Sequence, residues 1–134
     1  MHLRAEHFDG FSEHLVCWVL EASHGTAIVE ASWRGHGDRT ERVFEIDFPV
    51  SRIKECAEKL AELKPVYDGH VDDFPQYSLS VTEGDYKLST KVLAGVKWPD
   101  EDKAAVDSFM RVWRPLYSDI EELLAIPGRS NKLK

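Results

Sequence analysis

Residues 106–124 read VDSFMRVWRPLYSDIEELL, and the spacing of their apolar side chains decides the fold class. These side chains recur at steps of three and one, which is the spacing of one face of an α-helix. The stripe consists of Val106, Phe109, Met110, Trp113, Leu116, Tyr117, Ile120, Leu123 and Leu124. Because a long apolar face needs another apolar surface to cover, the rest of the chain must build a layer beneath this helix.

Flanking and internal residues predict where this helix begins, bends and ends. Asp100 is a candidate N-cap, since its carboxylate can accept a hydrogen bond from an amide of the first turn. Pro115 falls inside the periodic pattern and removes one backbone donor, so we expect a kink or a short break near Arg114. Pro127-Gly128 then ends the helix.

Other segments carry the patterns of β-strands. The stretch RVFEIDF at 42–48 alternates large apolar and acidic side chains, as a half-buried strand does. The continuous apolar run at 15–20 predicts a central strand covered on both faces, and residues 1–13 are interpreted as a lead-in to it. The predicted strands are 15–20, 26–33, 42–48, 77–82 and 86–91.

A shorter helix is predicted between the third and fourth of these strands. It places Ile53, Cys56, Leu60 and Leu63 on one face. The element order is therefore β-β-β-α-β-β-α, and its hairpins predict an antiparallel sheet. We expect an α+β fold in which a sheet of about five strands carries both helices on one face. A single domain would span residues 1–128, followed by a basic, flexible C-terminal tail at 129–134.

Composition narrows the classes of partner and compartment. The chain has 134 residues and a net charge of -7, so we expect no binding to nucleic acid or to anionic membranes and attraction to a basic protein. No apolar run has the length of a signal peptide or a membrane span, which favours the cytoplasm. Cys17 and Cys56 are interpreted as buried thiols, with a strand-to-helix disulfide as the alternative. A monomer or a homodimer is equally compatible with these features.

The best chemical cluster in the sequence is His70 with Asp72 and Asp73. A histidine beside two carboxylates could ligate a metal or carry out acid–base chemistry. The spacing matches no metal-ligand motif, however, and aspartates are also common in turns for backbone reasons. We therefore expect no cofactor, no metal and no catalytic residue.

Acidic side chains gather in the long loop and in the turn of the second hairpin. We expect these two segments to meet at one edge of the sheet and to bind a basic partner, with Tyr86 or Trp98 as an aromatic anchor. The acidic residues of this expected contact surface are Asp68, Asp72, Asp73, Glu83 and Asp85. Reversing the charges of Asp72 and Asp73 should then weaken partner binding without lowering the melting temperature.

The overall layout resembles a known class of bacterial proteins. The resemblance rests on the strand Phe44-Glu45-Ile46-Asp47-Phe48, the strand Tyr77-Ser78-Leu79-Ser80-Val81 with its turn Glu83-Gly84-Asp85, and the aromatic helix from Asp100 to Leu124. In these features the chain resembles the small cytosolic immunity proteins that bacteria carry beside polymorphic or contact-dependent toxins. The resemblance implies a non-enzymatic, acidic inhibitor that binds one toxin domain and blocks its active site or an essential surface. It supplies no motif from which a functional residue could be transferred.

Two other classes of function are compatible with the residues. One is a domain that binds a small ligand, or an enzyme, with a cleft between the sheet and the helices near His70 and Asp72. The other is a structural or adaptor subunit that pairs through a strand edge or through the final helix.

Overall fold

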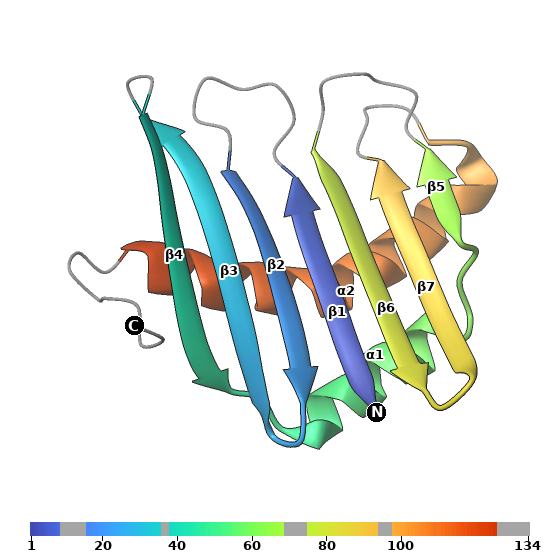
Figure 1. Cartoon of the computed structure of the whole chain (residues 1–134). Helices are drawn as coiled ribbons and strands as arrows, with labels where there is room; N and C mark the ends of the chain where they lie inside the picture. The colour runs from blue at the N-terminus through green and yellow to red at the C-terminus, as the bar shows by residue number, and fades with distance from the viewer. Residues whose placement is uncertain (9–15, 36–37, 69–74, 94–97, 126–134) are drawn as a thin grey trace.

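In the computed structural model, the described residues are 1–8, 16–35, 38–68, 75–93 and 98–125. They form seven strands in one sheet and two helices (Figure 1). The strands are β1 His2–Phe8, β2 Val16–Ser23, β3 Thr26–Gly35, β4 Asp38–Asp47, β5 Val66–Asp68, β6 Gln76–Glu83 and β7 Tyr86–Leu93, and the helices are α1 Val50–Leu60 and α2 Asp100–Ala125. The predicted α+β class is confirmed, and the tail at 129–134 lies outside the described residues.

The sheet has the order β4-β3-β2-β1-β6-β7-β5 and is mixed. All neighbours are antiparallel except β5, which pairs parallel to β7, so the expected antiparallel sheet of about five strands is a mixed sheet of seven. The five predicted strands are present, mostly with longer bounds, but β1 and β5 were not predicted. β5 has only three residues and no readable pattern. β1 replaces the expected lead-in with the central strand of the sheet, and it was missed because its inward positions include the small Ala5 and the polar His7.

Both helices lie on one face of the sheet, as predicted (Figure 1). α1 buries Ile53, Cys56 and Leu60 and packs against β6 and β7. Arg52 of α1 also donates a hydrogen bond to Asp119 of α2 across 2.8 Å. The two helices therefore form a single layer.

The sequence predicted a kink or a short break near Arg114, but α2 runs through Pro115 without a break. Pro115 is exposed, while Trp113 and Leu116 on either side of it are buried in the core. Core contacts thus hold the helix together on both sides of the missing backbone hydrogen bond.

The core lies between the helices and the facing side of the sheet. In β2 this side carries Trp18, Leu20 and Ala22, all buried, whereas Cys17 and Val19 on the other side are half-buried. The prediction that this strand is covered on both faces is therefore wrong.

The two cysteines lie in different environments and are not joined by a disulfide. Cys56 is buried as predicted, and burial raises the pKa of its thiol to about 11. Cys17 was also expected to be buried, but it is half-buried and projects from the side of β2 that faces away from the helices.

Candidate functional site

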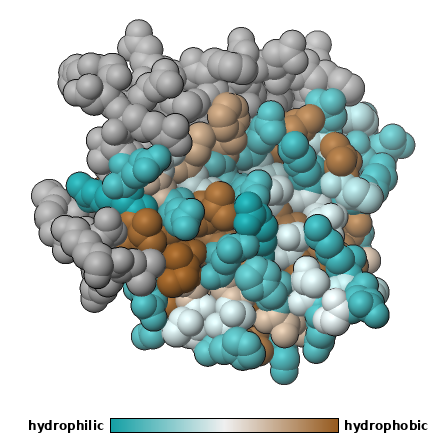
Figure 2. Space-filling model, viewed as in Figure 1, coloured by the Kyte–Doolittle hydropathy of each residue, from teal (hydrophilic) through white to brown (hydrophobic). Residues whose placement is uncertain are grey.

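The face of the sheet opposite the helices is covered by no other described element (Figure 1). Strand alternation brings one side chain from each strand into rows across this open face. One such row, from β4 to β7, is Val43, Glu30, Val19, Glu6, Ser78 and Lys91. Apolar and charged side chains alternate from Val43 to Glu6, and the row ends with the polar Ser78 and the charged Lys91. Figure 2 shows hydrophobic and hydrophilic surface side by side on this face.

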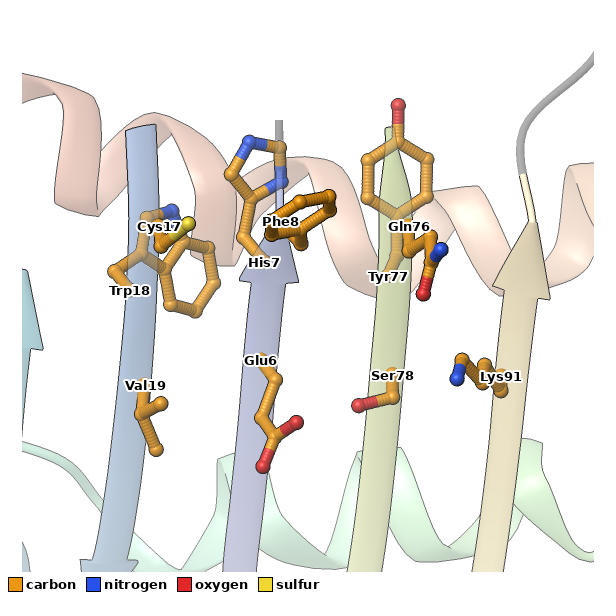
Figure 3. Close-up of a pocket in the computed structure, with 10 residues that line it drawn as sticks. All are labelled: Glu6, His7, Phe8, Cys17, Trp18, Val19, Gln76, Tyr77, Ser78 and Lys91. Atoms are coloured by element: carbon orange, nitrogen blue, oxygen red, sulfur yellow. The ribbon is translucent and has the colours of Figure 1, made fainter. Parts of the chain in front are cut away.

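The open face is hollowed at this row. A cavity of about 390 Å³ lies over β1, β2 and β6, and a second of about 230 Å³ adjoins it over β2 to β4. The two share Cys17 and Val19 in their linings. In Figure 3, Glu6, Ser78 and Lys91 lie on neighbouring strands along the first cavity. The resulting groove is shallow and open, which suits a large partner better than an enclosed small ligand.

An ion-pair cluster surrounds Arg4 at the centre of the open face. Its guanidinium donates to Glu6 across 2.6 Å and to Glu21 across 2.7 Å. These hydrogen bonds raise the pKa of Arg4, and the bond from Arg4 lowers the pKa of the Glu21 carboxyl. His2 lies 3.6 Å from Glu21 on the same cluster. Arg4 therefore neutralises only one of the two carboxylates, Glu6 and Glu21, in this part of the face.

Three carboxylates of β3 and β4 lie on the open face. Glu30, Glu45 and Asp47 are exposed there, and in the described part of the chain none of them forms an ion pair. Lysines of the open face, Lys87 and Lys91, lie on β7 at the far side of the sheet. The face therefore has an acidic side and a basic side, a pattern that orients a charged partner.

The acidic residues expected to form one contact surface do not all come together. Asp68 pairs with Leu93 at one end of the β5–β7 ladder. Glu83 pairs with Tyr86 at the hairpin turn, which lies at the opposite end of β7 (Figure 1).

The remaining members of the expected surface are distributed as follows. Asp85 lies in the hairpin turn and is exposed, and Tyr86 beside it is 64% exposed. Trp98 is partly buried and packs against the core just before α2. Asp72, Asp73 and His70 lie outside the described residues. Among the described members, therefore, only Glu83, Asp85 and Tyr86 share a location.

Sequence reasoning missed the aromatic cluster around His7 on the helix side of the sheet. His7 is 4% exposed. Its ring stacks on Trp18 and Tyr77, with centroids 5.7 and 5.6 Å away, and meets Tyr117 edge-on at 5.1 Å. The alternation of Leu3, Ala5 and His7 was the one signal that could have placed this histidine on the core side.

A cavity of about 290 Å³ opens beside this cluster. Its lining comes from the ends of β1 and β6 and from one face of α2. The lining residues are His7, Pro75, Tyr77, Met110, Trp113, Arg114 and Tyr117.

Within the described ranges of the chain, no group of three or more His, Cys, Asp or Glu side chains lies where it could hold a metal ion. None of the helices in those ranges has both the length and the apolarity needed to cross a bilayer.

Comparison with known proteins gives no family assignment. No family model matches the sequence, and no curated protein is similar to it. The geometry of this chain alone must therefore support any proposal about its function.

Proposed function

We propose that this chain is a non-enzymatic, protein-binding inhibitor of the immunity type, whose open sheet face docks a basic partner such as a toxin domain. The observation that carries the proposal is the hollowed sheet face opposite the helices, with its exposed carboxylates on β3 and β4. The rival functions are an adaptor subunit and a small-ligand-binding domain. Capture of a basic protein that arrests growth when expressed alone would favour the inhibitor over both.

Charge supports a basic partner. The net charge of the chain is -7, and Glu30, Glu45 and Asp47 face solvent on the same side of the sheet. Carboxylates grouped in this way accelerate encounter with a positively charged surface and disfavour acidic partners.

Shape supports a protein rather than a small ligand. The groove continues from β1 across to β4, and Val19 and Val43 interrupt its charges with half-buried apolar side chains. Interfaces of this kind combine a partly apolar centre with a charged rim, which excludes water from the contacts at the centre.

The test is affinity capture with charge-reversed variants. The wild-type chain and a Glu30→Lys/Glu45→Lys variant are immobilised and exposed to lysate from cells that make this chain. We expect the wild type to retain a basic protein, and the variant to bind it at least about tenfold more weakly. The captured protein should also arrest growth when expressed alone and not when co-expressed with the wild-type chain.

Two further variants locate the interface. Glu55→Lys/Glu58→Lys makes the same change in net charge on the exposed side of α1 and should leave capture unchanged. Asp72→Lys/Asp73→Lys tests the surface predicted from the sequence. Undiminished capture by the β3–β4 variant would refute the open face as the interface. Loss of capture with the Asp72 and Asp73 variant alone would assign binding to that segment instead.

A further inference from the structure

The cavity between α2 and the ends of β1 and β6 has the features of a small-molecule site distinct from the open sheet face. Its volume of about 290 Å³ lies at the lower end of the range for ligand pockets. Its lining shares His7 and Tyr77 with the first hollow of the open face but no residue with the hollow over β2 to β4, so a ligand there would not compete directly for the latter. A pocket of this size admits a molecule with one or two rings.

The walls of the cavity are mostly aromatic. Tyr77 and Trp113 lie at a ring-centroid distance of 5.1 Å, and Trp113 in turn stacks on Trp18 at 5.2 Å. His7 and Tyr117 complete the lining with a polar nitrogen-bearing ring and a phenol. Flat, rigid walls of this kind favour planar ligands, because ring stacking adds to the gain from burying apolar area.

The mouth of the cavity carries positive charge. Arg114 lines it and is exposed, and no carboxylate of the described residues forms an ion pair with it. Asp119, five residues further along α2, is already held by Arg52 at 2.8 Å. Among the described residues, Arg114 thus gives the cavity a cation that no carboxylate neutralises.

We propose that this cavity binds a small planar aromatic carboxylate, with its ring against Trp113 and Tyr77 and its carboxylate at Arg114. Aromatic cages elsewhere bind cations. Arg114 at the mouth opposes a cationic ligand and favours an anionic one. A guanidinium can hold a carboxylate through two parallel hydrogen bonds, which gives the charged group a defined orientation.

The proposal is tested by calorimetric titration with 2-naphthoate and with its neutral, size-matched analogue 2-naphthamide. We expect one 2-naphthoate to bind per chain, and 2-naphthamide to bind at least about fivefold more weakly. In a parallel NMR titration the indole signal of Trp113 should shift, while an amide on the far strand β4 such as that of Glu45 should not.

Three variants make the test specific. Arg114→Gln should weaken 2-naphthoate binding about fivefold or more and leave 2-naphthamide binding unchanged. Arg111→Gln, which removes the same charge from the same helix outside the cavity lining, should change neither by more than about twofold. Met110→Trp should fill the cavity and abolish binding of both probes.

Several results would overturn the proposal. They are the absence of 2-naphthoate binding up to its solubility limit, equal affinity for both probes, and an Arg114→Gln variant with wild-type affinity. Since Arg114 is exposed, its substitution should not unfold the chain, so a negative result with that variant counts directly against the site.

Discussion

At the scale of single residues, the two cysteine thiols lie on opposite sides of the sheet and differ in their burial. Cys56 is buried under α1, where burial raises the pKa of its thiol to about 11 from an ordinary value of 9.0. Cys17 is half-buried and lines both hollows of the open face. Because the thiolate is the reactive form, access and pKa together should make the two thiols react at very different rates.

We therefore expect an aromatic disulfide reagent at about pH 8 to modify one thiol per folded chain. Cys17→Ser should abolish this reaction, and Cys56 should react only after denaturation in urea. Absorbance of the released thiol measures both rates, and rapid modification of the Cys17→Ser variant would contradict the prediction.

Since folding raises the pKa of Cys56, its contribution to the free energy of unfolding is fully present below about pH 9 and is lost as pH rises toward about 11. Cys56→Ala should remove that part of the alkaline loss.

The aromatic cluster shows the limit of sequence-based prediction at this scale. Trp113 was correctly placed on the inward stripe of the helix by periodicity alone. His7 was not placed, because its environment comes from β2, β6 and α2, which are distant in sequence. Local patterns assign a side chain to a face, but only the strand order brings Tyr77 and Trp18 to either side of this ring.

At the scale of elements, α2 keeps a proline that an isolated helix would not favour. Pro115 is solvent-exposed and cannot donate the backbone hydrogen bond that would reach the carbonyl of Arg111. The prediction of a kink or a short break assumed that the cost of this missing hydrogen bond would outweigh the gain from core packing. Burial of Phe109 and Trp113 before the proline, and of Leu116 and Ile120 after it, outweighs that cost.

Replacing this proline should therefore stabilise the protein. Pro115→Ala restores the missing donor at an exposed position, and we expect it to raise the free energy of unfolding by about 1–3 kcal/mol. Urea denaturation followed by circular dichroism measures the change. Ser118→Ala, at another exposed position of α2, is the control and should shift stability by less than about 0.7 kcal/mol. A Pro115→Ala variant no more stable than the wild type would contradict this prediction, because it would show that the missing hydrogen bond has no net cost in the folded protein.

At the scale of the whole molecule, the hairpins were predictable and the centre of the sheet was not. The pairs β2–β3 and β6–β7 join neighbouring segments through short turns, so alternation and glycine positions reveal them. β1 pairs with β2 on one side and with β6 on the other, and neither its charged residues nor its single large aliphatic side chain marks it as central. The groove on the open face was missed for the same reason. It lies partly over β1, and a sheet predicted without β1 has no such groove.

Strand order makes a prediction about local stability. The amides of β1 have partners on both sides, whereas β4 and β5 form the two edges of the sheet. In hydrogen exchange followed by mass spectrometry, peptides from β1 should exchange about as slowly as global unfolding allows, and peptides from β4 should exchange faster. Equal rates for the two strands would contradict this order of protection.

The central position of β1 also affects how the chain folds as it is synthesised. Leu3 pairs with Ala22 early, but its other partner, Val81, follows only after the ribosome has made β2 to β5 and α1. Until then the nascent β4-β3-β2-β1 sheet exposes an unpaired β1 edge that other chains could extend. Closing so long a loop is entropically slow, so the arrival of β6 should set the rate of folding. Substitutions that weaken β1–β6 contacts would then lower the yield of soluble protein more than their effect on equilibrium stability suggests.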